Sequence, residues 1–411
     1  MNVVILTQHF ETPEDNGSDR IFFFARELVK EGNKVKVITA NFDYKAGRKR
    51  FDVKGQIIKE VSGIEVVYVP VYSNIRGSFF KRFIFFISFM LTCLRSLMNS
   101  SRNADVIWGI STPLTVPLIC AITARLTKVP LLVEITDVWP DAAVHSGVVS
   151  NRLLISLAKQ IELFCYKSAN KIVCLTEGIQ QNIIDKGVDA TKTCLVTNGI
   201  DLDLFNKSNF KDRDSLKSSL GLGNKIVAMY LGAHGKYNAL DTIIQAAIIL
   251  RDEDSIVFVF VGDGEEKARL ELLVAKENLK NVLFHPPVKR IHAPEFLSIA
   301  DFFLLPNLAG DFFRGNLPNK VFDYLATGRP IIVAGHVESG KLVEKIKAGY
   351  VVEAENYNLF AEAILKVSRL TPDERNSMGS RGADYVRTYY DRKIHAKYIL
   401  SSLKLVATGY D

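Results

Sequence analysis

The stretch NLPNKVFDYLATGRP, residues 316–330, has the marks of a loop that runs into a short helix. Its first proline suits an opening helical turn, and either Asn316 or Asn319 could cap that turn. Gly328, followed closely by a second proline, would end the helix. The stretch therefore predicts a short helix that is entered from a tight loop.

The start of this predicted helix is suited to binding an anion. Backbone N–H groups of a first helical turn have no partners within the helix, and the helix dipole places positive potential there. Lys320 would add a positive charge, and Asp323 would follow about one turn later. A nucleoside diphosphate would fit, with its phosphates at the helix start and its ribose hydroxyl groups on the carboxylate. An ordinary helix with a solvated acid explains the same residues, so both interpretations stay open.

Length and composition predict two domains. The chain has 411 residues, of which 48% are hydrophobic, and such a chain divides into α/β domains of about 150–200 residues each. Its net charge of +7 favours anionic partners such as nucleotides, diphosphate lipids or a membrane surface, without a special indication of nucleic acid. The five cysteines form no C-x-x-C pair, which predicts reduced core thiols and a cytosolic location.

Residues 79–98, FFKRFIFFISFMLTCLRSLM, form the most apolar long stretch of the chain. Its uncharged core, residues 83–94, is shorter than the roughly 20 residues that a membrane-spanning helix requires. Lys81, Arg82 and Arg95 flank this core. Two interpretations remain open: a basic helix in the headgroup layer of an anionic bilayer, or a buried helix packed on a sheet.

The first half of the chain alternates strands with helices. A single glycine, Gly17, lies in the loop before the first helix, and the dinucleotide-binding pattern G-x-G-x-x-G is absent. Gly17 either lets the backbone approach a ligand or belongs to an ordinary turn. The alternation predicts a parallel sheet covered on both faces, with ligands bound at the carboxyl ends of its strands. The predicted strands are residues 3–6, 34–39, 64–70, 104–108, 130–136 and 171–175.

Asp137 stands at the end of the fifth of these strands. Because neighbouring odd and even positions of a strand face opposite sides, Glu134 and Asp137 would not form a cooperating carboxylate pair. Asp137, at the carboxyl end of the strand, is the better candidate for catalysis. The alternative is that Asp137 and Trp139 only shape a rigid turn before Pro140.

The second half repeats the alternation after a polar linker, residues 206–215. Glycine-bearing turns follow two strands, at residues 232–236 and at residues 262–264. Glycines at such positions can bring backbone N–H groups to a phosphate, although each could equally be a plain turn residue. The predicted strands are residues 225–230, 256–261, 281–285, 302–305 and 331–334.

Several ordered motifs together resemble the retaining glycosyltransferases of family 4, which have the GT-B fold. VTNGIDLDLF at residues 196–205 is similar to that family's NG-[VI]-D-x-x-x-F, and VFVFVGDGEEKARLE at residues 257–271 to its strand with G-D-G. NKVFDYLATGRPIIV at residues 319–333 is similar to its E-A-M-A-x-G-x-P-V helix. Residues 107–149, which contain DVWPD, resemble the bacterial surface-polysaccharide branch.

The resemblance implies two Rossmann-like parallel-sheet domains that face a deep interdomain cleft. Residues 1–206 would form the acceptor-side domain, and residues 207–389 the donor-binding domain. A final helix, at about residues 390–411, would pack back on the first domain.

The resemblance also implies a set of site residues. Asp323 takes the place of the ribose-binding acid, residues 232–236 match the phosphate-contacting loop, and Val288 falls where the base meets the backbone. Asp137 adjoins the position of a catalytic-site histidine, which is Thr136 here, so His145 could substitute. The catalytic candidates are thus Asp137 and His145, and the substrate-binding candidates are Gly17, Gly232, His234, Gly235, Lys236, Gly262, Asp263, Val288, Arg314, Asn316, Asn319, Lys320 and Asp323.

Three departures from the family pattern concern the donor site. Gly315 stands where the first acid of the E-x7-E pair belongs, and the second acid is Asp323 instead of glutamate. Ala233 replaces the usual arginine of the phosphate loop. The usual lysine is represented by the differently spaced Lys236, unless His234 shares its role.

The function implied is transfer of a sugar from a nucleotide donor, expected to be UDP-linked, to a lipid-linked or saccharide acceptor in O-antigen or capsule synthesis. Retention of configuration is expected, with a hexosyl or N-acetylhexosaminyl group transferred and neither a cofactor nor a metal ion required. The expected acceptor is a saccharide on polyprenyl diphosphate, and the expected location is the cytoplasm or the inner face of the plasma membrane. Two alternatives are a non-catalytic nucleotide-sugar-binding subunit and a nucleotide-sugar 2-epimerase.

Overall fold

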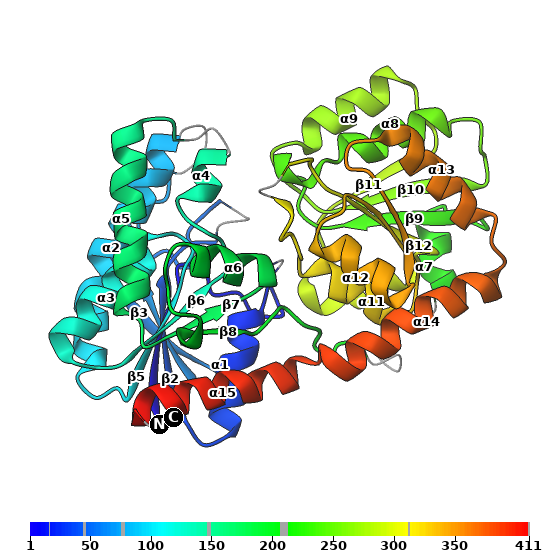
Figure 1. The fold of residues 1–411 in the computed structure, drawn as a ribbon. Coiled ribbons are helices and arrows are strands. Elements are labelled where there is room, and N and C mark those ends of the chain that lie inside the picture. Colours follow the sequence, from blue (N-terminus) through cyan, green and yellow to red (C-terminus); the bar gives the residue numbers. More distant parts are fainter. Residues whose placement is uncertain are drawn as a thin grey trace. The chain divides into compact units, whose positions relative to one another are not determined.

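The computed structural model describes residues 1–15, 17–43, 47–74, 79–145, 149–205, 213–310 and 313–409. The chain forms two compact units, each built on its own sheet (Figure 1). The first unit comprises Met1–Thr12, Gly17–Thr197 and Lys393–Asp411, and the second comprises Pro13–Asn16 and Asn198–Arg392.

The first unit contains an eight-stranded sheet with the order β3-β4-β2-β1-β5-β6-β7-β8. Its strands are β1 (Asn2–Leu6), β2 (Lys34–Ala40), β3 (Ile57–Val61), β4 (Ile64–Val69), β5 (Val106–Ile110), β6 (Leu131–Ile135), β7 (Lys171–Cys174) and β8 (Thr193–Leu195). Its helices are α1 (Arg20–Lys30), α2 (Phe79–Ser101), α3 (Thr115–Thr127), α4 (Asp141–His145), α5 (Arg152–Ser168), α6 (Glu177–Asp185) and α15 (Arg392–Thr408), with the 3-10 turn η1 (Ala190–Lys192).

This sheet is not wholly parallel, which corrects the sequence-based expectation. β3 pairs antiparallel with β4 across a two-residue turn in which Ser62 and Gly63 both have positive φ, the conformation that tight hairpins favour. β3 is an edge strand whose three central residues are exposed. It therefore lacks the apolar run by which the central strands were predicted.

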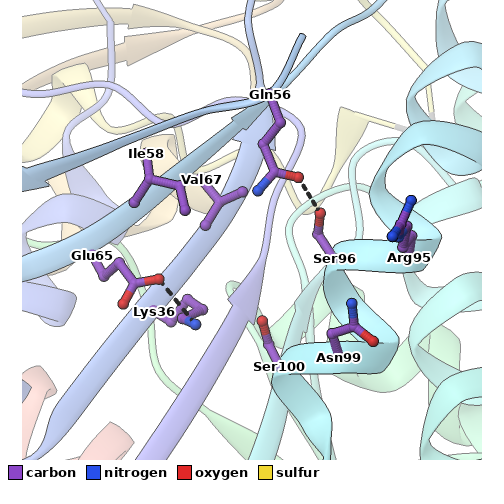
Figure 2. Close-up of a pocket in the computed structure, with 9 residues that line it drawn as sticks. All are labelled: Lys36, Gln56, Ile58, Glu65, Val67, Arg95, Ser96, Asn99 and Ser100. Carbon is purple, nitrogen blue, oxygen red and sulfur yellow. Dashed lines mark hydrogen bonds and ion pairs between the residues drawn. The ribbon is translucent and has the colours of Figure 1, made fainter.

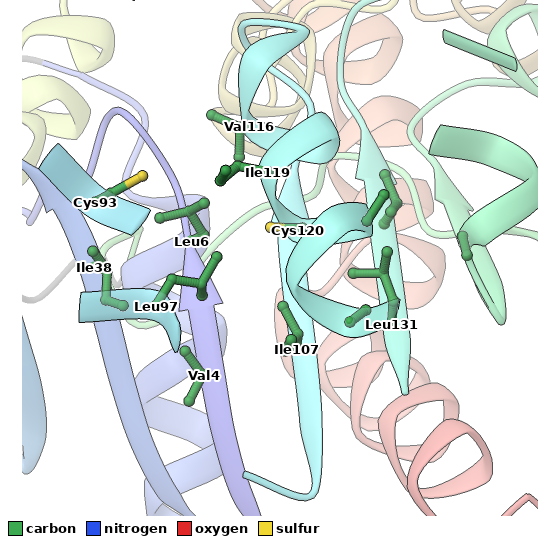
Figure 3. Packing of buried hydrophobic residues seen from close by; sticks show 14 of the residues in the cluster. Val4, Leu6, Ile38, Cys93, Leu97, Ile107, Val116, Ile119, Cys120 and Leu131 are labelled. Atoms are coloured by element: carbon green, nitrogen blue, oxygen red, sulfur yellow. The ribbon is translucent and has the colours of Figure 1, made fainter. Parts of the chain in front are cut away.

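Alternate residues of the first sheet enter two cores. Val4 and Leu6 of β1 join Cys93 of α2 and Cys120 of α3 on one face (Figure 3), while Ile5 lies in the opposite core with residues of α1 and α15. The period of two along a strand accounts for this division. All five cysteines are free thiols.

Helix α2, which contains residues 79–98, is buried on one side and exposed on the other. Phe85, Phe89 and Cys93 are buried in the core beneath the helix, whereas Phe80 is 66% and Leu91 64% exposed. The segment Phe80–Ser101 is also long and apolar enough to cross a membrane by length and composition alone, with only 28% of its most apolar window buried. By this criterion the apolar segment is longer than the uncharged core, residues 83–94, indicated.

The second unit contains a six-stranded parallel sheet with the order β11-β10-β9-β12-β13-β14. Its strands are β9 (Ile226–Leu231), β10 (Ile256–Val261), β11 (Val282–His285), β12 (Phe302–Pro306), β13 (Ile331–Ala334) and β14 (Gly349–Val352). Its helices are α7 (Arg213–Ser219), α8 (Asp241–Ile249), α9 (Lys267–Lys276), α10 (Ala293–Ser298), α11 (Lys320–Ala326), α12 (Glu338–Ile346), α13 (Tyr357–Ser368) and α14 (Pro372–Tyr389), with the 3-10 turns η3 (Lys236–Asn238) and η4 (Arg290–His292).

Apart from Pro13–Asn16, the second unit runs from Asn198 to Arg392, whereas residues 207–389 were expected for the donor-binding domain. The amide of Ile200 donates to the carbonyl of Tyr390, and the amide of Arg392 donates to the carbonyl of Ile200. These two hydrogen bonds join the segment by which the chain enters the second unit to the segment by which it leaves that unit. Most of the predicted linker, residues 206–212, lies outside the described residues.

Candidate active site

The two glycine-bearing turns that follow β9 and β10 pack directly on each other. A Cβ atom on Gly262 would lie 2.0 Å from the carbonyl oxygen of Gly232, and one on Gly264 would lie 2.3 Å from that of His234. Gly262 also has a φ of +147°, which side chains rarely allow. The close approach of two backbones therefore requires these glycines, with or without a ligand.

Replacing Gly262 with alanine is expected to lower the free energy of unfolding by about 2 kcal/mol or more, because the new methyl group would collide with backbone atoms that cannot swing away. Gly235→Ala in the same turn is the matched control, since its Cβ would meet its nearest neighbour, Asn238, at an ordinary 3.4 Å. Urea denaturation followed by fluorescence measures both variants. Equal stability of the two variants would contradict the packing described.

Lys320, the first residue of α11, places its amino group against the turn after β9. The Nζ atom donates to the Tyr230 hydroxyl and to Oδ1 of Asn238, the latter at 3.1 Å. A Cβ atom on Gly232 would lie 2.7 Å from Nζ. Lys320 therefore supplies a positive charge at the turn predicted to contact the phosphates, where Ala233 stands. The anchoring residue Asn238 was missed because nothing in the sequence indicated its partner.

His234 lies in the same turn, but it cannot act as a second cation there. The residue is fully buried, and its ring is close to those of Tyr230, Phe260 and Phe284. Burial, with the charges of two nearby lysines, lowers its pKa to about 4, so the ring is neutral at neutral pH. A neutral, buried ring would not supply the positive charge of the missing lysine, and whether His234 contacts the donor stays a prediction. Neither ring nitrogen has a hydrogen-bond partner within the described residues.

Asp323, the predicted ribose-binding acid, is paired with Arg290 of η4. Its oxygens accept from Nη1 at 2.5 Å and from Nη2 at 2.7 Å, and the two side chains are 8% and 6% exposed. A carboxylate offers about four lone-pair positions, so two remain for other donors. Arg290 was not predicted, because it lies far from Asp323 in the sequence and in no recognisable motif.

Neither asparagine caps α11 as predicted. Asn319 has helical backbone angles and no side-chain cap bond, and its Oδ1 accepts from Arg392 at 3.3 Å. Asn316 donates to Oδ1 of Asn307 at 2.7 Å. Its carbonyl and that of Arg314 accept the backbone amides that open α12. These residues build the loop that leads into α11.

The remaining donor-side candidates are placed as follows. Lys236 and Asp263 are exposed, and the Asp263 carboxylate accepts from the amide of Gly264 at 2.9 Å. Val288 is half-buried and packs against the core of the second unit.

In the first unit, Asp137 follows β6 and is bound by the loop after β5. Its Oδ2 accepts from the Thr112 hydroxyl at 3.2 Å, and Thr112 also pairs with Thr136 at 2.6 Å. The Ser111 hydroxyl contacts the Asp137 carbonyl at 3.4 Å. The residue as a whole is exposed, but the surrounding protein keeps water from its carboxyl group. This desolvation raises the pKa of Asp137, and the Thr112 hydrogen bond acts in the opposite direction. Such an acid can hold or accept a proton above the pH usual for aspartate.

The other two candidates of the first unit are placed as follows. His145 is the last residue of α4, and its side chain lies outside the described part of the chain. A Cβ atom on Gly17 would lie 2.5 Å from Oε2 of Glu11, so Gly17 makes room for that side chain. Whether Gly17 also approaches a ligand stays a prediction.

A cavity of about 390 Å³ lies elsewhere in the first unit, between α2 and the edge of the sheet (Figure 2). Lys36 pairs there with Glu65 at 2.9 Å, and Ser96 donates to Gln56 at 2.6 Å. None of the predicted site residues lines it. Over the described residues, no group of three acidic, histidine or cysteine side chains could hold a metal ion.

Two family models match the chain. Residues 22–199 match a glycosyl transferase 4-like domain, and residues 212–385 match the glycosyl transferases group 1. The solved structure of Anabaena Alr3699/HepE in complex with UDP and glucose aligns with a TM-score of 0.73 and 15% identity, over 98% of this chain and 99% of the other. WaaG, a glycosyltransferase involved in lipopolysaccharide biosynthesis, aligns with a TM-score of 0.70 and 16% identity, over 98% and 99% of the chains. These likenesses establish the GT-B fold.

Two relatives from Escherichia coli are each 28% identical. WcaI of strain K12, provisionally named a colanic acid biosynthesis glycosyl transferase, matches over 77% of this chain and 79% of its own. UDP-Gal:alpha-D-GlcNAc-diphosphoundecaprenol alpha-1,3-galactosyltransferase matches over 60% of this chain and 62% of its own. The chain therefore belongs to the family 4 glycosyltransferases with the GT-B fold, and to their surface-polysaccharide branch.

Proposed function

We propose that the protein transfers a hexosyl or N-acetylhexosaminyl group from a UDP-sugar to a saccharide on polyprenyl diphosphate, with retention of configuration, in O-antigen or capsule synthesis. The observation that carries the proposal is the Lys320 amino group held against the glycine turn after β9. The UDP bound in the HepE structure and the diphosphoundecaprenol acceptor in the galactosyltransferase name support the donor and acceptor.

The donor half of the reaction needs positive potential where the diphosphate departs. As the bond between the sugar C1 and the diphosphate oxygen breaks, negative charge grows on that oxygen. Lys320 and the backbone N–H groups of the glycine turns would stabilise it without a metal ion. The two unused lone pairs of Asp323 would accept the ribose hydroxyl groups while Arg290 holds the carboxylate in place.

The acceptor half forms the new bond from the acceptor hydroxyl oxygen to C1, on the face that the diphosphate leaves. The hydroxyl proton passes to a diphosphate oxygen, so the departing UDP acts as the base. Asp137 would orient the sugar or the acceptor hydroxyl through its carboxylate. Because polyprenyl-linked acceptors lie in a bilayer, the proposal includes peripheral contact with the inner face of the plasma membrane.

The proposal is tested by incubating the protein with a panel of UDP-sugars and native membranes and measuring UDP release. Release that depends on the lipid-linked acceptor is expected, with a product whose anomeric configuration matches the donor by NMR. Lys320→Met should lower kcat/KM by about a hundredfold, because the charge on the leaving group loses its partner. The control Lys276→Met removes an exposed lysine of α9 and should leave the rate unchanged.

The same assay separates the alternatives. An altered nucleotide sugar without transfer would indicate an epimerase. UDP-sugar binding without any turnover would indicate a binding subunit, which the departures at Gly315 and Ala233 would then explain.

A further inference from the structure

Helices α2, α3 and α5 cover one face of the first sheet, with α3 packed against both of the others. Each helix returns from the carboxyl edge of the sheet and ends two to four residues before the next strand, so the last turns all lie near the amino edge of the sheet. The helices have 23, 13 and 17 residues, or about 35, 20 and 26 Å at 1.5 Å per residue. The first turns of α2 and α5 must therefore extend beyond the start of α3.

These projecting turns carry large apolar side chains that nothing in the first unit covers among the described residues. On α5, Leu153, Leu154 and Leu157 are 81%, 57% and 55% exposed. On α2, Phe80 and Phe83 are 66% and 47% exposed. Soluble surfaces rarely gather so many exposed large apolar side chains without a partner. We call these five residues the projecting surface.

The exposed charged residues of α2 and α5 are all basic. Helix α2 contains no acidic residue, and the single acid of α5, Glu162, is 1% exposed and binds Lys186 at 2.6 Å. The basic residues of the two helices include Lys81 and Arg152, which stand beside the exposed phenylalanines and leucines. Apolar side chains within a basic rim suit the headgroup layer of an anionic bilayer. A second copy of the same surface would instead bring like charges together.

We propose that the projecting turns of α2 and α5 together dock the protein on an anionic bilayer, with the leucines of α5 inserting beside the phenylalanines of α2. The surface extends from the carboxyl edge of the first sheet, the same edge at which Asp137 stands. Docking would therefore bring this edge to a diphosphate headgroup. This last consequence rests on the proposed function, whereas the docking itself does not.

The test is sedimentation of the full-length protein with vesicles of phosphatidylethanolamine and phosphatidylglycerol. We expect binding that weakens in high salt and on pure phosphatidylcholine. Leu153→Ser/Leu154→Ser/Leu157→Ser should lower partitioning by about a hundredfold. Leu272→Ser, which changes a leucine of α9 that is 71% exposed in the second unit, is the matched control. Circular dichroism and thermal midpoints establish that both variants are folded.

The outcomes are separable. Loss of vesicle binding in the triple variant, with transfer to a detergent-dispersed acceptor retained, supports docking. Unchanged vesicle binding overturns it, as does a wild-type dimer that the triple variant converts to a monomer. Vesicle binding without transfer to any acceptor would leave docking supported and remove the proposed function.

Discussion

Asp323→Ala should lower the free energy of unfolding by about 3–5 kcal/mol, because it removes the bidentate partner of a buried arginine. Both oxygens of Asp323 bind Arg290, and both side chains are almost fully buried. Urea denaturation measures the loss. A change below about 1 kcal/mol would show that the pair adds little to the folded state.

Loss of stability must be separated from loss of donor binding at the same residue. Arg290→Met/Asp323→Leu replaces the pair with apolar side chains and should recover most of the stability. It should still bind UDP about ten to a hundredfold more weakly, since the ribose hydroxyl groups lose a charged acceptor. Calorimetric titration with UDP measures this. Wild-type affinity in the double variant would rule out the ribose role of Asp323.

Asp137→Asn is expected to lower kcat by about a hundredfold while KM for the UDP-sugar changes little. The amide keeps the size of the side chain and can still accept from Thr112, so the loss would come from the carboxylate charge. Asp252→Asn, an exposed acid after α8, is the control. Equal kcat in both variants would remove Asp137 from the site.

The pH dependence of kcat provides a second test of the catalytic role of Asp137. The protein around it raises the pKa of this carboxyl group, so it takes up a proton at a higher pH than an ordinary aspartate. If the ionised form is required, kcat should fall on the acid side through that raised pKa. The acid limb should disappear in Asp137→Asn.

The apolar runs of the sequence located the central strands of both sheets, because buried parallel strands are continuous apolar segments. Three strands were not predicted, namely β3, β8 and the edge strand β14. β3 is an exposed edge strand, and β8 has only three residues. The order of motifs likewise indicated α11 correctly, as Lys320–Ala326.

Side-chain partners could not be predicted in the same way. The bonds of Asp323 to Arg290 and of Lys320 to Asn238 join residues that only the fold brings together. The neutrality of His234 depends on three aromatic neighbours from β9, β10 and β11. Sequence patterns describe the spacing of residues along the chain. The properties above depend instead on residues that are distant in sequence and close in space.

The position of α15 determines the order in which the two units can complete their folding during synthesis. Ile399, Leu403 and Val406 complete the core that contains Phe24 and Trp108 of the first unit. That core stays open until α15 has been synthesised, although its strands are among the first to emerge. The second unit, whose sequence ends at Arg392, can finish folding earlier. During synthesis the first unit is therefore expected to expose its unfinished core for longer than the second unit does.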